Sequence, residues 1–193
     1  DPSLQTMPER ISIVGNTGSG KSTLAGQLAA GLGYPHIELD ALHWEPGWQS
    51  AADDVFRRRV QLATAQECWV VDGNYSRVRD IIYERLQMLV WLDYPLSVNL
   101  WRLTRRGLKR IITREDLWES GNRESFRGQF LSRDSLYVWA IKTHQIKRER
   151  YLSLMADPDF AHISIVRLRS PAAANRWRRR FLDGTVQVAS NMR

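Results

Sequence analysis

The sequence predicts an α/β protein with a three-layer P-loop fold, in which helices cover both faces of a parallel five-stranded sheet. Short runs rich in β-branched and other apolar residues recur along the chain, and the stretches between them are long enough for helices. A glycine-rich string of the phosphate-binding type directly follows the first run. Parallel strands need long crossover connections, so this alternation favours a parallel sheet.

The expected strands are the apolar runs at residues 11–14, 36–39, 69–71, 88–92 and 163–168. A helix should follow the glycine-rich string, because Leu24, Leu28 and Leu32 repeat every four residues and Gly33 ends the pattern.

The remaining helices have recognisable starting signals. Ser50 and Asp53 have the spacing of a capping box, which predicts a helix that begins near Asp53. Pro95 fits the first turn of another helix, whose middle Gly107 should weaken. We expect a polar helix over residues 134–155 and a closing helix over residues 172–182.

The composition fits one domain with a substantial core, since 43% of the 193 residues are apolar. No apolar run approaches a membrane span and no secretory signal pattern opens the sequence, so we expect a cytoplasmic protein. We expect residues 7–113 and 134–185 to form the core, with 1–6 an expression leftover and 186–193 a tail. Residues 114–133 are charged, contain glycine and lack clear periodicity, which predicts a lid.

The glycine-rich string satisfies the pattern G-x-x-x-x-G-K-[ST], which lies here between a strand and a helix as the motif requires. Its members are Gly15, Asn16, Thr17, Gly18, Ser19, Gly20, Lys21, Ser22 and Thr23. Glycines let the backbone turn around an anion, and the following helix adds unpaired amides. Lys21 can bridge the β and γ phosphates, and the Ser22 hydroxyl can enter a magnesium shell. The sequence therefore predicts binding of ATP with Mg²⁺.

A carboxylate at a neighbouring strand end should serve the metal ion. Asp72 follows the apolar run 69–71 and precedes Gly73, so it is our candidate; the alternative is that it caps the next helix. Asp93 ends another run, but the following Tyr94-Pro95 favours a role in helix entry.

Asp40 ends the second run and should face the same crevice as Asp72, because ligands bind outside the carboxyl ends of parallel strands. It could orient or deprotonate an acceptor hydroxyl, and Trp44 could stack on an acceptor ring. Alternatively, Asp40 starts a turn and the tryptophan covers the core. Asn74 and Tyr75, just after Asp72, are further candidates for acceptor contacts.

Four strings together resemble the bacterial DNA topology modulation (FlaR-type) proteins, which look like members of the adenylate-kinase-like P-loop superfamily. These strings are residues 15–23, 38–44, 69–75 and 121–125. The resemblance implies the sheet order 2-3-1-4-5 with a lid before the last strand, and it places Asp72 where adenylate kinases carry the aspartate of D-G-F-P-R. This sequence departs from that motif after Gly73, where it has Asn74-Tyr75-Ser76.

Two functions follow from these observations. The first is a small-molecule kinase. Arginines of the expected lid support it, because they could stabilise the negative charge of the phosphoryl group during transfer. They are Arg123, Arg127 and Arg133, and the alternative is that they only form a solvated face. The second, suggested by the family name, is a nucleotide-switched DNA-binding protein. Its contacts would come from the basic segment after Trp101, namely Arg102, Arg105, Arg106, Lys109 and Arg110. Neither a zinc-finger spacing nor a basic zipper is present, which favours the kinase acting on a nucleotide-like or nucleoside-like acceptor.

Overall fold

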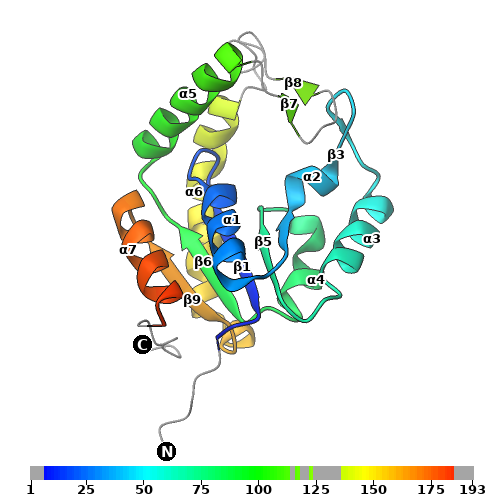
Figure 1. The fold of residues 1–193 in the computed structure, drawn as a ribbon, viewed down its shortest axis with the longest axis vertical. Coiled ribbons are helices and arrows are strands. Elements are labelled where there is room, and N and C mark those ends of the chain that lie inside the picture. The colour runs from blue at the N-terminus through cyan, green and yellow to red at the C-terminus, as the bar shows by residue number, and fades with distance from the viewer. Residues whose placement is uncertain (1–6, 114–115, 118–121, 124–135, 185–193) are drawn as a thin grey trace, which may run out of the picture.

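A central parallel sheet organises the molecule (Figure 1). The computed structural model describes residues 7–113, 116–117, 122–123 and 136–184. Five strands lie in the spatial order β2-β5-β1-β6-β9 and all pair in parallel. They are β1 (Arg10–Gly15), β2 (His36–Glu38), β5 (Trp69–Asp72), β6 (Met88–Leu92) and β9 (Ser164–Leu168). Counted along the chain, this order is 2-3-1-4-5, so the predicted fold class is confirmed.

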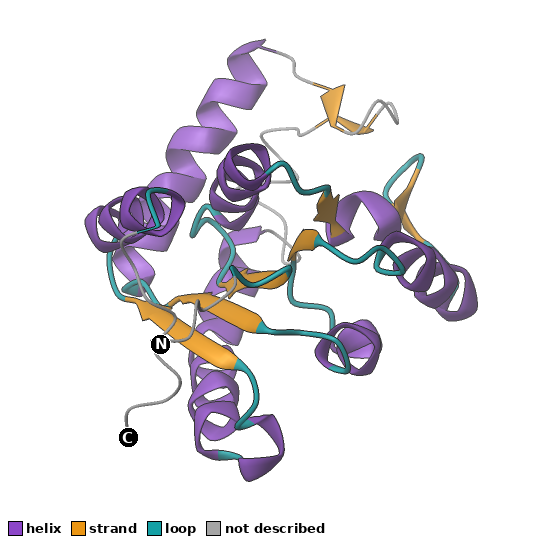
Figure 2. Ribbon diagram, turned by 60° about the horizontal axis from the view of Figure 1, so that its bottom comes forward, coloured by secondary structure: helices purple, strands orange, loops and turns teal. Residues whose placement is uncertain are grey.

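Helices cover both faces of this sheet, as Figure 2 shows. They are α1 (Lys21–Leu32), α3 (Asp53–Ala63), α4 (Arg79–Tyr83), α5 (Leu96–Thr113), α6 (Leu136–Ala156) and α7 (Pro171–Leu182). Side chains of α1 and α7 pack with Ile11 and Ile13 of β1 on one face. Side chains of α3, α4 and α6 pack with Val14 on the other, as the alternation of a strand requires.

The structure differs from the sequence prediction at several local points. The second strand ends at Glu38, because α2 (Leu39–His43) begins at the next residue. The predicted capping box is wrong: Ala52 is the N-cap of α3 without a side-chain hydrogen bond, and Ser50 belongs to a hairpin of β3 (Trp44–Glu45) and β4 (Gln49–Ser50). Gly107, in contrast, lies inside α5 as the sequence analysis placed it, and the helix continues through it.

The smaller elements complete the chain. Two 3-10 turns, η1 (Ser76–Val78) and η3 (Pro158–Phe160), precede α4 and β9. Two strands of two residues each, β7 (Asp116–Leu117) and β8 (Asn122–Arg123), pair antiparallel inside the segment expected to form a lid. Across the described ranges, no helix has both the length and the apolar character needed to cross a membrane.

Strand register brings the candidate polar residues to one edge of the sheet. Asp72, the last residue of β5, is in register with Ile13 of β1 and with Glu38 of β2. Gly15, the last residue of β1, is in register with Leu92 of β6. The carboxyl ends of β1, β2, β5 and β6 therefore meet where the glycine-rich loop starts, as is usual for ligand sites of open parallel sheets.

Candidate functional site

The loop between β1 and α1 can be built only with glycine at its turning points. Gly18 and Gly20 adopt φ angles of 81° and 89°, which side chains disfavour. A Cβ atom on Gly18 would lie 2.3 Å from the main-chain oxygen of Asn99, and one on Gly20 would lie 2.6 Å from a guanidinium nitrogen of Arg102. The loop backbone therefore lies tightly against α5.

The N-terminus of α1 is free of a side-chain cap, because Gly20 is its N-cap residue. Uncapped amides at a helix start are an anion-binding group. Lys21, the first residue of α1, donates a hydrogen bond from Nζ to the Asn16 carbonyl at 3.2 Å. Burial lowers the pKa of Lys21, while the charges of Asp40 and Asp72 act in the opposite direction. The loop, the lysine and both candidate carboxylates thus belong to one electrostatic environment.

Ser22 and Asp72 are in direct contact, since the Ser22 hydroxyl donates to Asp72 Oδ1 at 2.9 Å. The other carboxylate oxygen lies 2.7 Å from His36 Nε2, and this hydrogen bond is the main cause that raises the pKa of His36. Within the described residues, no three His, Cys, Asp or Glu side chains form a metal-binding group. One hydroxyl and one carboxylate fit Mg²⁺, which typically completes its shell with phosphates and water. His36 gave no signal in the sequence, because it is 36 residues from Asp72.

Asn74 is fixed against the start of the loop. Its Oδ1 accepts hydrogen bonds from the Gly15 amide at 3.2 Å and from the Tyr151 hydroxyl at 2.9 Å, and its Nδ2 donates to the Gly15 carbonyl at 2.5 Å. The carboxyamide therefore joins β1, the loop after β5 and α6.

Asp40 lies in α2 and accepts a 2.5 Å hydrogen bond from the Tyr75 hydroxyl. Burial and then the Asp40 charge raise the pKa of Tyr75, which keeps this phenol a donor at neutral pH. Next to it, the buried His43 ring lies 4.7 Å from both the Tyr75 and the Trp44 ring centroids. Trp44 in turn lies 5.7 Å from Trp48. The structure thus brings Asp40, Trp44 and Tyr75 together, and their contact with an acceptor stays a prediction.

The helix α6 contributes residues that sequence reasoning missed. The buried Asn16 amide donates to the Ala140 carbonyl at 2.9 Å and lies 3.2 Å from His144 Nδ1. Its Oδ1 accepts from the Thr17 amide at 2.9 Å and from Lys147 Nζ at 3.5 Å. Burial, and then the nearby Lys21 charge, lowers the pKa of Lys147 to about 8. A second amine therefore lies beside the glycine-rich loop.

Some of the arginines of the basic helix α5 also lie near this loop. Arg102 lies against Gly20, and the Arg106 charge contributes to lowering the pKa of Lys21. Arg105, in contrast, is exposed. Arg123 falls in β8, while Arg127 and Arg133 lie outside the described residues.

Asp93 does not join the site. Its side chain is 6% exposed and accepts a hydrogen bond from Arg167 Nε at 2.9 Å. It also forms an ion pair with Arg148, whose Nε lies 3.5 Å from Asp93 Oδ1. This ion pair connects the end of β6 to β9 and α6. A structural role thus accounts for its position.

Comparisons with known proteins agree with this architecture, although no family model matches the chain. A cytidylate kinase of Natronomonas pharaonis is 31% identical over 137 residues, which are 61% of this chain and 69% of that protein. A shikimate kinase structure from Acinetobacter baumannii, in complex with shikimate, superposes with a TM-score of 0.54 at 18% identity and covers 95% of this chain and 98% of its own. A gluconokinase from Sinorhizobium meliloti gives 0.52 at 20% identity, with 94% and 93% covered.

A glycine-rich loop joining β1 to α1 on a 2-3-1-4-5 sheet defines a P-loop nucleotide-binding protein. The chain belongs to the P-loop kinase family that includes this cytidylate kinase. The narrower assignment to the DNA topology modulation proteins stays a prediction.

Proposed function

We propose that this protein transfers the terminal phosphoryl group of ATP, with Mg²⁺, to the hydroxyl or phosphate oxygen of a small nucleotide-like or nucleoside-like acceptor. The observation that carries the proposal is the gathering of Lys21, the Ser22–Asp72 pair and Asp40 at one edge of the sheet. Kinship with a cytidylate kinase supports a nucleotide-like acceptor. Likeness in fold to a shikimate kinase extends the candidates to small hydroxylated acids.

In this proposal the loop amides from Gly15 to Thr23 bind the phosphates, and Lys21 bridges the β and γ phosphates. Ser22 and Asp72 would hold Mg²⁺, which would neutralise charge on the phosphate oxygens. Lys147 and Arg102 would add positive charge from the α6 and α5 sides, since both lie against the loop.

Asp40 would act on the acceptor. One of its oxygens accepts from Tyr75, which fixes the carboxylate and leaves the second oxygen to accept a proton from an acceptor hydroxyl. Trp44 and Tyr75 would contact the acceptor, and Asn74 would keep the loop after β5 fixed to Gly15. Arg123, Arg127 and Arg133 remain predicted contributors from the segment 114–133.

The alternative of a DNA-binding protein is less well supported by the basic helix. Arg102 and Arg106 are one turn apart on α5 and both approach the P-loop, so part of the basic surface serves the nucleotide side. A surface that binds DNA along α5 would instead need these charges to point outward.

An acceptor panel tests the proposed function. ADP release from Mg·ATP would be measured with nucleoside monophosphates, nucleosides, shikimate and gluconate, in the wild type and in Lys21→Ala. We expect at least one acceptor to stimulate ADP release, and Lys21→Ala to abolish the stimulation. The proposal is contradicted if no acceptor stimulates release and Lys21→Ala leaves the basal rate unchanged.

A further inference from the structure

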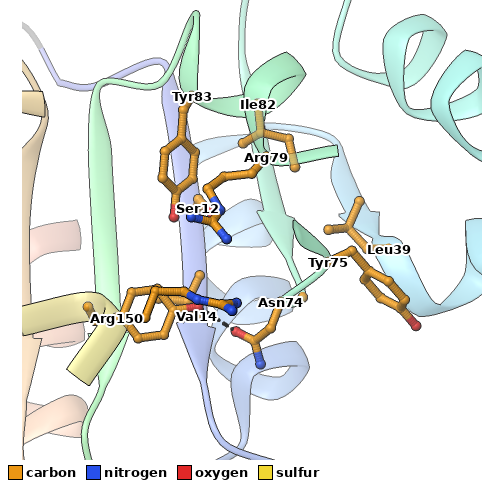
Figure 3. Close-up of a pocket in the computed structure, with 11 residues that line it drawn as sticks. Ser12, Val14, Leu39, Asn74, Tyr75, Arg79, Ile82, Tyr83 and Arg150 are labelled. Carbon is orange, nitrogen blue, oxygen red and sulfur yellow. Dashed lines mark hydrogen bonds between the residues drawn. The ribbon is translucent and has the colours of Figure 1, made fainter. Parts of the chain in front are cut away.

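A pocket opens beside the P-loop, on the sheet face that α4 and α6 cover (Figure 3). The hollow measures about 330 Å³, a volume that includes space open to solvent. None of its lining residues is acidic, and its polar lining comprises Ser12, Asn74, Tyr75, Arg79, Tyr83, Arg150 and Tyr151.

Two arginines supply the charge of this pocket. Figure 3 shows Arg79 from α4 and Arg150 from α6 extending into the pocket from different walls. Within the described part of the chain, neither guanidinium pairs with a carboxylate. Arginines at a surface usually find an acidic neighbour or open solvent, whereas these two converge on one hollow. No carboxylate of the described residues therefore neutralises their positive charge in this hollow.

Neutral donors accompany the two guanidinium groups. Burial raises the pKa of Tyr83 to about 12, while the charges of Arg79 and Arg150 act to lower it, so both guanidinium groups lie within electrostatic reach of this phenol. The Tyr83 hydroxyl consequently remains a neutral donor at physiological pH. Together with Ser12 these groups form a set rich in donors and poor in acceptors, which is the complement of an oxyanion.

The pocket also adjoins the reaction edge through two of its walls. Asn74 forms one wall and hydrogen-bonds to Gly15, the first residue of the P-loop. Tyr75 forms another and donates to Asp40. Asn74 therefore connects the pocket to the start of the P-loop, and Tyr75 connects it to Asp40.

We infer that Arg79 and Arg150 bind a compact oxyanion, a phosphate or carboxylate group carried by the acceptor at the end away from the reacting oxygen. This inference rests on the proposed function and restricts its acceptor to an anionic molecule. Arginine binds such planar or tetrahedral oxyanions through paired N–H donors.

Calorimetric titration with two small probes tests the inference. Methyl phosphate represents a phosphorylated acceptor and acetate a carboxylated one, each titrated into protein saturated with Mg²⁺ and a non-hydrolysable ATP analogue, so that the P-loop is filled. We expect one probe to bind, and Arg79→Gln or Arg150→Gln to weaken it about 10- to 100-fold, as loss of a charged hydrogen-bond donor predicts. The preferred probe identifies which oxyanion the acceptor carries.

Arg176→Gln is the matched control, because Arg176 is exposed on α7 at the opposite face and its replacement removes the same charge. It should leave probe binding unchanged. The inference is overturned if neither probe binds the wild type at millimolar concentration, or if Arg176→Gln weakens binding as much as the pocket variants do.

Two further measurements distinguish a failure of this inference from a failure of the proposed function. If the ATP analogue fails to bind the wild type, the proposed function fails, and probe titration without nucleotide still decides whether the pocket binds anions. If Arg79→Gln does not fold, Arg150→Gln decides, since Arg150 is exposed and its replacement should preserve the core.

Discussion

Lys147 offers a sharp test of how the site recognises phosphate. Its amine lies 3.5 Å from Asn16 Oδ1, and burial beside Lys21 lowers its pKa to about 8. A bound triphosphate would bring negative charge to this place, so the pKa of Lys147 should return toward the ordinary value of about 10.4. Because the bound form has the higher pKa, nucleotide binding should take up protons.

The size of this effect follows from the pKa. With a free pKa of about 8 and a bound pKa of about 10.4, binding should take up ~0.1 proton at pH 7, ~0.5 at pH 8 and ~0.9 at pH 9. Affinity for the ATP analogue should fall about tenfold from pH 7 to pH 9 for the same reason.

Calorimetry in buffers with different ionisation enthalpies measures this proton uptake. Lys147→Arg keeps the charge at every pH used and should lose the uptake assigned to Lys147, whereas Lys147→Met should also weaken analogue binding about 10- to 100-fold. Lys142→Met, an exposed lysine on the same helix, should behave as the wild type. Equal proton uptake in the wild type and in Lys147→Arg would refute the reasoning.

Three other substitutions have distinct expected outcomes. Gly18→Ala should weaken ATP-analogue binding at least tenfold, because its Cβ would meet the backbone of α5 at 2.3 Å with φ at 81°; wild-type affinity would argue against the tight loop. Asp72→Asn should raise the magnesium concentration needed for activity, while Asp40→Asn should lower kcat and leave Mg·ATP-analogue binding nearly intact; the reverse pattern would exchange their roles. Asp93→Ala should lower the free energy of unfolding by about 3 kcal/mol in urea denaturation, because it leaves the Arg167 charge without its buried partner; a change below 1 kcal/mol would contradict this.

Local patterns predicted most of the fold. The strand at residues 10–15, the loop after it and α1 form one continuous segment, so their sequence signals need no distant partner. The predicted strand runs also became parallel strands, and the three central ones, β1, β5 and β6, are buried on both faces, as is typical of apolar runs in a parallel sheet. Ser50 illustrates the opposite case: its capping pattern was overridden by pairing with Trp44 in a hairpin.

The missed residues of the site depend on contacts between distant segments. Asn16 meets Ala140 and Lys147 across 124 and 131 residues of sequence, and such pairing has no local signature. In the sequence, Lys147 looks like any polar residue of a charged helix. Its pKa is lowered because α6 packs against the P-loop, which partly buries the amine and brings it near the Lys21 charge.

Binding of Mg²⁺ and a non-hydrolysable ATP analogue tests the central claim most directly. Calorimetry should give a one-to-one complex with the wild type, and Lys21→Ala should weaken it at least tenfold while circular dichroism and the thermal unfolding midpoint show an intact fold. Failure of the wild type to bind the analogue, or equal affinity in the folded Lys21→Ala variant, would contradict the assignment of the P-loop as the site of this protein's chemistry.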